Sequence, residues 1–404
     1  MSTSLLYHGF GIRGYRHRRT EYVGGRVLMW IEQDPSELCC PLCGSADVVR
    51  KGCQERRFHM VPIGSKPVIL VFPVPRVACP VCGGVRQVPI PFALPRRTYT
   101  KVFERYAVDL SHHTTILDVA RHLGVGWDII KDIQVRYLTR RFGRPKLKRL
   151  RKIAIDEIAI GKGHRYLTVV LDLASGAVVF VGEGKGTQAL TPFWERLRRS
   201  RARIEAVATD MSPAYIAAVH ENLPGAVLVF DHFHVIKLFN EKLSDLRRAL
   251  QREATELLHK KVLKGTRWLL LKNPENLDPR RGERERLEEA LRVNKPLATA
   301  YYMKEDLRQL WTQPDKATAE RVLNDWIARA EASGIRMLQD FARTLAEHRS
   351  GLLAYYDHRI STGPLEGTNT KIKLLQRQAY GFRDMGFFKL KIMGLHESRI
   401  ALVG

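Results

Sequence analysis

Residues 360–373 read ISTGPLEGTNTKIK, and the interpretation of the rest of the chain starts from this stretch. Gly363-Pro364 ends extended structure and favours a first helical turn, because proline fixes φ there and needs no amide hydrogen. Beyond it, one acid, one amide and two cations recur at helical spacing, namely Glu366, Asn369, Lys373 and Arg377. Such a stripe suits a metal-bound phosphodiester, but it is also typical of a solvated helix face. The choice depends on whether the chain supplies partner carboxylates.

The composition predicts a globular protein with a polyanionic partner. The 404 residues are enough for two to four domains, and the 67 Lys+Arg against 42 Asp+Glu leave a net charge of +25. This excess favours a phosphate polymer, because bound cations release its counterions. No apolar run approaches roughly 18 residues and no leader is evident, so neither a membrane-spanning helix nor a signal peptide is predicted. We therefore expect a cytoplasmic protein, associated with the nucleoid if its partner is DNA.

Two cysteine pairs predict a metal site. The pairs stand in CPLCG at 40–44 and CPVCG at 79–83, and the strand-like segment Pro67–Val74 lies between them. A knuckle, a hairpin and a second knuckle make a zinc ribbon, in which four thiolates close a tetrahedral shell and leave no catalytic position. The predicted ligands of one structural Zn²⁺ are Cys40, Cys43, Cys79 and Cys82. A redox CxxC pair is the alternative; Cys39 could replace Cys40 in register, and Cys53 is left over.

Before the cysteines, Tyr22–Ile31 is interpreted as one strand. After them, the sequence predicts a DNA-binding element. Residues 99–142 show helical periodicity, broken by LGVG at 123–126. Two helices joined by a short glycine turn suit a helix-turn-helix whose recognition helix starts near Trp127, although an ordinary helical hairpin has the same pattern. The run from Arg136 to Lys152 holds nine Lys or Arg and no acid, as a solvated linker or a phosphate-tracking segment would. The candidate DNA contacts are Trp127, Lys131, Arg140, Arg141, Lys146 and Lys148, with Lys373 and Arg377 farther on.

From Lys152 the pattern changes to short apolar strands and two helices, in the order βββαβαβ. The predicted strands are 153–157, 165–173, 177–181, 204–210 and 226–231, and the predicted helices are 187–199 and 213–221. Asp156 is placed near the end of the first strand and Asp210 at the end of the fourth. This order of strands places the first and the fourth side by side. Residues 235–356 are then helical throughout.

Asp156, Asp210 and Glu366 are the candidate catalytic residues. Two divalent ions about 4 Å apart can cut and join phosphodiesters, and carboxylates suit Mg²⁺, with Mn²⁺ as a substitute. We expect Asp156 to bridge the two ions and each of the others to hold one. Asp210 could instead be only a turn residue ahead of a helix. Asp231, followed by His232 and His234, also ends a strand, and a supporting role is preferred to a ligand role.

Several of these stretches together resemble one family. They are the two CPxCG knuckles, IAIDEIAIGKGHRYLTVVLDL at 153–173, VATDMSPAY at 207–215, VLVFDHFHVIKL at 227–238 and RISTGPLEGTNTKIKLLQRQAYGFRD at 359–384. Over residues 38–400 the combination is similar to bacterial insertion-sequence transposases of the DDE class, in particular the ISL group. The resemblance implies an RNase H-like core interrupted by a helical insertion, Mg²⁺ dependence and terminal inverted repeats as the bound DNA. Its catalytic triad falls on Asp156, Asp210 and Glu366. Thr362 departs from the family, which often has Asn before Gly-Pro, and this affects the helix start rather than the metal ligands.

The expected fold is therefore multidomain α/β, with a zinc ribbon, a helix-turn-helix and an RNase H-like mixed-sheet core that carries an all-helical insertion. The expected domains are the zinc-ribbon region 1–98, the helix-turn-helix and basic linker 99–150, the core 151–245, the insertion 246–355 and the rest of the core 356–404. The expected activity is cleavage of double-stranded DNA at element ends and joining of the 3′-hydroxyl to target DNA, by a homodimer or larger oligomer. The alternatives are an inactive, domesticated DNA-binding regulator and an RNase H-like nuclease without strand transfer.

Overall fold

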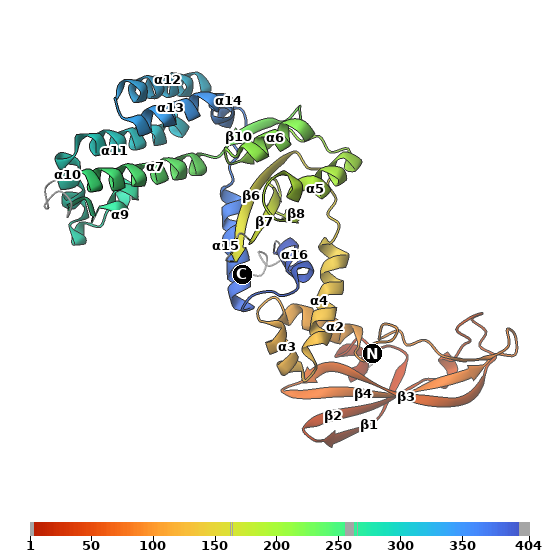
Figure 1. Cartoon of the computed structure of the whole chain (residues 1–404). Helices are drawn as coiled ribbons and strands as arrows, with labels where there is room; N and C mark the ends of the chain where they lie inside the picture. The colour runs from red at the N-terminus through yellow and green to blue at the C-terminus, as the bar shows by residue number, and fades with distance from the viewer. Residues whose placement is uncertain (1–3, 162, 164, 255–261, 265, 396–404) are drawn as a thin grey trace. The chain divides into compact units, whose positions relative to one another are not determined.

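A computed structural model describes residues 4–161, 163, 165–254, 262–264 and 266–395. The chain divides into two compact units, Met1–Arg144 and Pro145–Gly404 (Figure 1). Each unit has its own five-stranded sheet.

The first unit is built on a five-stranded sheet of order β1-β2-β4-β3, with β5 paired to β4. Its elements before residue 99 are α1 (Leu5–His8), β1 (Tyr15–Val23), β2 (Arg26–Gln33), β3 (Val49–Ile63), β4 (Lys66–Ala78) and β5 (Val85–Gln87). The predicted strand Pro67–Val74 is confirmed as the buried centre of β4. The prediction of one strand over Tyr22–Ile31 is wrong, because Gly24 and Gly25 take φ of 56° and 73° and turn the chain into the β1–β2 hairpin.

Three helices complete the first unit and confirm the helix-turn-helix prediction: α2 (Lys101–Leu110), α3 (Ile116–Leu123) and α4 (Trp127–Phe142). The Thr115 hydroxyl caps α3 by accepting the Asp118 amide at 3.2 Å, and Gly124 ends α3 in the left-handed region at φ 65°. A separate apolar cluster that includes Phe103, Val119 and Ile130 holds the three helices together.

The second unit contains a mixed sheet of order β10-β9-β6-β7-β8. Its strands are β6 (Lys152–Gly161), β7 (Arg165–Asp172), β8 (Val178–Glu183), β9 (Ala206–Thr209) and β10 (Val227–Phe230), with the helices α5 (Thr187–Ser200) and α6 (Pro213–Asn222). β6 pairs with β7 antiparallel and with β9 parallel, and β9 pairs with β10 parallel. The predicted βββαβαβ order, with its first and fourth strands adjacent, is confirmed.

The first strand of this sheet is longer than predicted. β6 continues to Gly161, so the prediction that Asp156 lies near the end of the strand is wrong. The parallel ladder with β9 stops at the Ala154–Ala208 pair, whereas the antiparallel ladder with β7 continues to Gly161–Arg165. Asp156 therefore marks the end of the parallel ladder and not the end of the strand.

Helices form the rest of the second unit. They are α7 (His232–Glu253), α9 (Arg267–Leu271), α10 (Glu283–Val293), α11 (Lys295–Arg308), α12 (Lys316–Ala332), α13 (Arg336–Glu347), α14 (Arg349–Leu353), α15 (Gly363–Gln378) and α16 (Met385–Met393). α7 packs against α9, α11 and α13 (Figure 1). Edge-on contacts among the rings of Phe239, Trp326 and Phe341 fill the space between helices. None of the helices in the described ranges combines the length and apolarity needed to cross a membrane.

Candidate catalytic site and zinc centre

The structure brings the four predicted zinc ligands together. The Sγ atoms of Cys40 and Cys82 lie 3.4 Å apart and those of Cys43 and Cys79 lie 3.5 Å apart, and all four lie within 4.8 Å of one another. Cys39 and Cys53 are exposed and lie outside this group. The register that uses Cys40 rather than Cys39 is therefore the one in which the knuckles converge.

Backbone geometry makes the two knuckles alike. The Gly44 amide donates to the Cys40 carbonyl and the Gly83 amide to the Cys79 carbonyl, both at 3.0 Å, and the two glycines have φ of 75° and 68°. Amide hydrogen bonds from Cys43 and Leu42 lower the pKa of the Cys40 thiol to about 6, which favours the thiolate. Four converging sulfurs fit a structural zinc, because they fill its tetrahedral shell.

Asp156 and Asp210 are neighbours across the sheet. The parallel register pairs Ala154 with Ala208, so its continuation by two residues places Asp156 opposite Asp210. Aligned residues of parallel strands point to the same face. One Asp210 oxygen accepts the Ser212 amide at 3.0 Å in the turn before α6, so Asp210 also has the turn role that the sequence left open.

Asp156 lies in a polar, largely enclosed position. Its two oxygens accept the Asn369 side-chain amide at 2.9 Å and the Glu157 backbone amide at 2.7 Å. Burial raises the pKa of the Asp156 carboxyl above its usual range and the Asp210 charge raises it further, against the opposing charges of His234 and Lys237. A buried carboxylate with a like charge beside it is stabilised by a bound cation.

Asn369 supplies a second sign of a cation site. Its Oδ1 is buried, and within the described part of the chain it accepts no hydrogen bond, although its Nδ2 is bonded to Asp156. An amide oxygen beside two carboxylates is a set of hard oxygen donors, which is what Mg²⁺ prefers. Sequence reasoning placed Asn369 on the Glu366 stripe but did not select it, although its spacing of three residues from Glu366 was a usable signal.

Glu366 lies on α15, one turn before Asn369, and is exposed. Among the described residues, the four cysteines are the one set of three or more His, Cys, Asp or Glu whose ligand atoms converge. The structure thus places Asp210 close enough for its charge to act on Asp156, and Glu366 on the helix that contacts Asp156, without bringing all three carboxylates into one ligand set. Lys373 and Arg377 are exposed on later turns of α15.

Asp231 fixes the start of α15. Its buried carboxylate accepts the Thr362 hydroxyl at 2.6 Å and lies 3.3 Å from the His232 ring nitrogen Nδ1. Burial would raise the pKa of Asp231, but the neighbouring His232 ring and the hydrogen bond from Thr362 outweigh it and hold this pKa low. The carboxylate therefore links the end of β10, the start of α7 and the start of α15.

Glu157 faces away from the acids, as its place next to Asp156 predicts. Its Oε1 accepts the Tyr215 hydroxyl at 2.6 Å, from α6. Tyr215 also contacts the Thr168 hydroxyl at 3.3 Å and is buried, which agrees with a structural role.

The predicted DNA contacts fall in both units. In the first unit, Trp127 is 56% exposed at the start of α4, Arg140 and Arg141 are exposed near its end, and Lys131 is half-buried between them. In the second unit, Lys146 and Lys148 are exposed ahead of β6.

Comparisons with known proteins agree with this anatomy. Residues 153–392 match the family model for the ISL3 transposase, residues 88–138 match the helix-turn-helix domain of the same family, and residues 37–82 match the zinc finger of the IS204/IS1001/IS1096/IS1165 transposases. The chain is 34% identical over 393 residues to the transposase for insertion sequence element IS1001 of Bordetella parapertussis, covering 95% of each chain. It is 30% identical over 387 residues to the transposase for IS1557 of Mycobacterium tuberculosis, covering 89% of this chain and 86% of that one.

A more distant likeness was found among solved structures. The Drosophila P element transposase strand transfer complex matches with a TM-score of 0.38 and 11% identity, over 75% of this chain and 93% of that one, which is too low to support an argument. The family matches, in contrast, include all four cysteines, both helices of the helix-turn-helix and the three candidate acids. The chain therefore belongs to the ISL3 family of insertion-sequence transposases, DNA transposases with a DDE domain, a helix-turn-helix and a zinc ribbon.

Proposed function

We propose that this transposase binds the terminal inverted repeats of its element, hydrolyses the DNA at their ends and joins the exposed 3′-hydroxyl to target DNA. Asp156, Asp210 and Glu366 are the proposed ligands of two Mg²⁺ ions. The observation that carries the proposal is the hydrogen bond to Asp156 from Asn369, which lies on the helix that bears Glu366, at the point where the parallel register ends two residues before Asp156 and Asp210.

The surrounding residues have separate roles. When bound, the two ions activate the attacking oxygen and stabilise the leaving oxygen. Asn369 orients the Asp156 carboxylate, and the buried Asp231–Thr362 hydrogen bond sets the position of α15. Lys373 and Arg377 neutralise phosphates beside the scissile bond, because their exposed cations lie farther along the same helix.

Recognition of the element ends is assigned to the first unit. A helix-turn-helix presents the start of its second helix to the major groove, and here that start is the exposed Trp127, with Lys131 one turn later. Arg140 and Arg141 of the same unit contact phosphates, and Lys146 and Lys148 at the start of the second unit are further phosphate contacts. Because two ends must be cut and joined together, the working form is a dimer or a larger oligomer on DNA.

Cleavage of end-containing DNA tests the catalytic part of the proposal. The purified chain with Mg²⁺ is expected to nick the DNA at the element boundary, and Asp156→Asn, Asp210→Asn or Glu366→Gln is expected to lower the rate by about 1,000-fold or more, since each removes a metal ligand worth several kcal/mol. Binding of the end DNA should persist. Glu205→Gln is the matched control, because Glu205 is an exposed carboxylate directly before β9, at the opposite end of that strand from Asp210. If one of these three variants cleaves at a near-native rate, the residue that it replaces is not a metal ligand.

A donor that already carries a free 3′-hydroxyl separates joining from cutting. The transposase is expected to join this donor to a second duplex. Cutting without joining would instead identify a nuclease, and tight end binding without either reaction would identify a regulator.

A further inference from the structure

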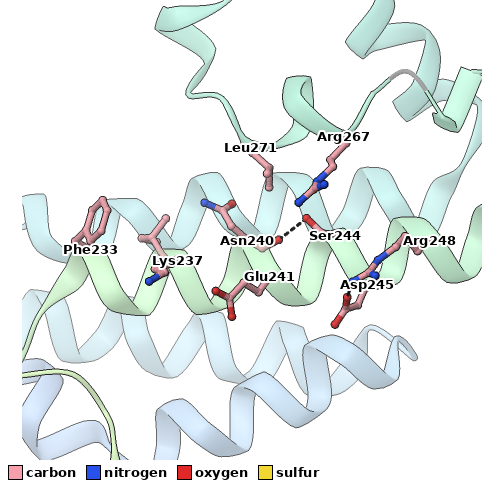
Figure 2. Close-up of a pocket in the computed structure, with 10 residues that line it drawn as sticks. Phe233, Lys237, Asn240, Glu241, Ser244, Asp245, Arg248, Arg267 and Leu271 are labelled. Atoms are coloured by element: carbon pink, nitrogen blue, oxygen red, sulfur yellow. Dashed lines mark hydrogen bonds and ion pairs between the residues drawn. The ribbon is translucent and has the colours of Figure 1, made fainter. Parts of the chain in front are cut away.

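A groove of about 540 Å³ runs along α7 where α9 lies against it (Figure 2). Polar, basic and aromatic side chains line it, including Phe233, Lys237, Asn240, Ser244, Arg248 and Arg267. We propose that this groove binds the sugar-phosphate backbone of the DNA that passes through the catalytic site, on one side of the scissile phosphate. The inference rests on the proposed function and extends it, since none of these residues belongs to the triad or to the predicted DNA contacts.

The groove begins beside the catalytic acids. α7 starts directly after Asp231, and the charges of His234 and Lys237 act on the Asp156 carboxyl. Lys237 lines the near part of the groove and Arg248 the far part. Arg248 lies eleven positions after Lys237, a rise of about 16 Å along the helix, which is about five steps of duplex DNA at 3.4 Å per step. A strand leaving the acids along α7 would therefore meet cations over about half a helical turn.

Positive charge collects at the far part of the groove. Arg248 and Arg267 line it, and Arg247 lies beside them with 6% of its surface exposed. Arg247 donates to the Leu263 carbonyl at 2.9 Å and to Gln251 at 3.0 Å, but its buried Nε has no partner and no carboxylate pairs with it within the described residues. Burial lowers the pKa of Arg247, and the charges of Arg267 and Arg248 lower it further. A phosphate in the groove would relieve this repulsion.

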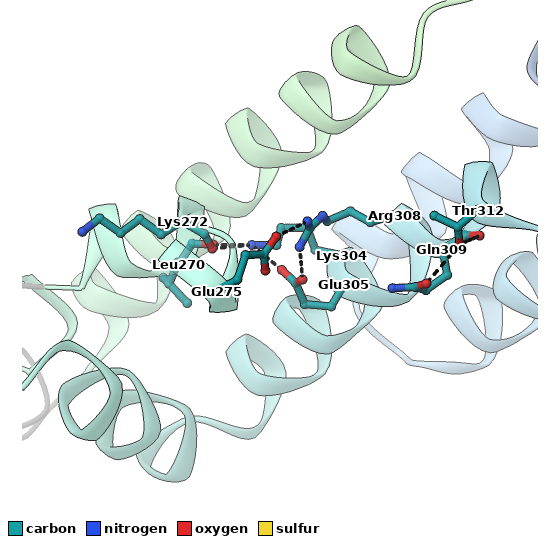
Figure 3. Close-up of polar contacts among 8 residues, drawn as sticks. All are labelled: Leu270, Lys272, Glu275, Lys304, Glu305, Arg308, Gln309 and Thr312. Carbon is teal, nitrogen blue, oxygen red and sulfur yellow. Dashed lines mark hydrogen bonds and ion pairs between the residues drawn. The ribbon is translucent and has the colours of Figure 1, made fainter. Parts of the chain in front are cut away.

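The α9 wall of the groove is fixed from behind. Lys304, which is 1% exposed, donates to the Leu270 carbonyl at 2.7 Å and pairs with Glu305 at 2.8 Å (Figure 3). Arg308 bonds Glu305 at 2.6 Å and Glu275 at 2.9 Å. Since these contacts hold the end of α9 against α11, the backbone wall that carries Arg267 is in place before a ligand binds.

Two acids in the groove allow a second test, because removing an acid should strengthen DNA binding whereas removing a cation should weaken it. Glu241 and Asp245 also line it, and Asp245 pairs with Arg248. If Arg248 contacts phosphate, Asp245 competes for it and repels the DNA. Removing the Asp245 charge should therefore tighten DNA binding, whereas on a merely solvated helix face it would change nothing.

The test measures binding of the full-length transposase to end DNA by fluorescence anisotropy in EDTA, so that no cleavage occurs. For the double variant Arg248→Ala, Arg267→Ala we expect weaker binding and a salt slope, log K against log [salt], smaller by about two, because two phosphate contacts are lost. Asp245→Asn is expected to bind more tightly than the unaltered chain. Arg321→Ala is the matched control, since Arg321 is exposed on α12 and lines a different pocket. Unchanged melting temperatures establish that the variants are folded.

An unchanged salt slope in the double variant would overturn the inference, and so would binding by Asp245→Asn that is no tighter than that of the unaltered chain. Because both readouts need no metal, a failure of the triad variants to lose cleavage would refute the catalytic proposal and leave these results standing. DNA shortened by about five base pairs on the element side or on the flank side locates the strand. If one shortening abolishes the difference in DNA affinity between the unaltered chain and the double variant, the removed side is the one that lies in the groove. A difference in affinity that persists with both shortened duplexes would count against the inference.

Discussion

The zinc centre and the catalytic acids differ in how far the structure assembles them. The four cysteine sulfurs converge within 4.8 Å, and each pair is held by a local turn. The acids come from β6, from the turn after β9 and from α15, and Asp210 raises the pKa of Asp156. A local turn therefore positions the two ligands within each zinc knuckle, whereas each of the three acids is positioned by a different element and tertiary packing must hold their like charges together.

Breaking the zinc centre should have the largest effect. Cys79→Ser is expected to abolish zinc binding and unfold the knuckle region, because zinc sites of this type contribute on the order of 10 kcal/mol to folding. End binding should fall with it, while the second unit keeps its fold. Zinc content by atomic absorption and the thermal unfolding curve measure the change.

Cys39→Ser is the control for this variant. Cys39 is exposed and lies outside the sulfur cluster, one residue from Cys40. It should keep one zinc per chain and full end binding. Equal zinc loss in both variants would show that the ligand register is wrong.

Near the catalytic acids, we expect the largest effect from a mutation that removes the buried Asp231–Thr362 hydrogen bond. Thr362→Val removes the donor and leaves a buried carboxylate short of a partner, which should destabilise the fold by about 1–3 kcal/mol. Cleavage should fall as well, because the start of α15 is no longer fixed relative to Asp231. Denaturant unfolding and the cleavage rate measure the two effects.

Thr370→Val makes the same chemical change on the exposed side of α15, where the hydroxyl donates to the Glu366 carbonyl. It should leave both quantities nearly unchanged. Thr362→Ser should restore both, since it restores the hydroxyl, and a Ser variant as slow as the Val variant would argue against the hydrogen bond as the cause.

The contrast between local and long-range structure also explains which features could be predicted from the sequence. The spacing of the cysteines and the βββαβαβ pattern are local signals, and both correctly gave the ribbon and the sheet order. The sequence predicts Asp156 near a strand end because the apolar run 153–155 ends there in two acids, but the ladder that ends at this point is the one with β9, while β6 itself continues to Gly161. The Asp231–Thr362 and Asp156–Asn369 bonds join residues 131 and 213 positions apart, and no local pattern predicts such pairs.

A third prediction concerns Asn369. Asn369→Asp adds a carboxylate beside Asp156, so the metal-free chain should lose stability through like-charge repulsion, and added Mg²⁺ should recover more stability than in the unaltered chain. Melting temperatures with EDTA and with a Mg²⁺ series measure this. If the melting temperature of Asn369→Asp does not change with Mg²⁺ concentration, Asn369 does not belong to the cation site.

The smallest expected effect is on stability against pH. The pKa of Asp156 is raised in the folded chain, so its proton favours folding: the contribution is present below the ordinary Asp range and is lost as pH rises through the folded pKa. At neutral pH the metal-free Asp156 carboxylate therefore destabilises the folded chain, and Asp156→Asn should melt a few degrees higher than the unaltered chain. The gain should disappear as the pH falls into the ordinary Asp range.

The Asn side chain can be accommodated because the Asn369 Oδ1 has no hydrogen-bond partner among the described residues and can turn to accept from it. Asp172→Asn is the control of opposite sign, since the Asp172 carboxylate accepts the Ala174 and Ser175 amides at 3.2 and 3.3 Å in the β7–β8 turn. It should melt lower at neutral pH. Added Mg²⁺ should stabilise the unaltered chain and the Asp172 variant but not Asp156→Asn, so the order of melting temperatures changes only if Asp156 holds the ion. An Asp156→Asn variant that Mg²⁺ stabilises as strongly as the unaltered chain would place the cation elsewhere.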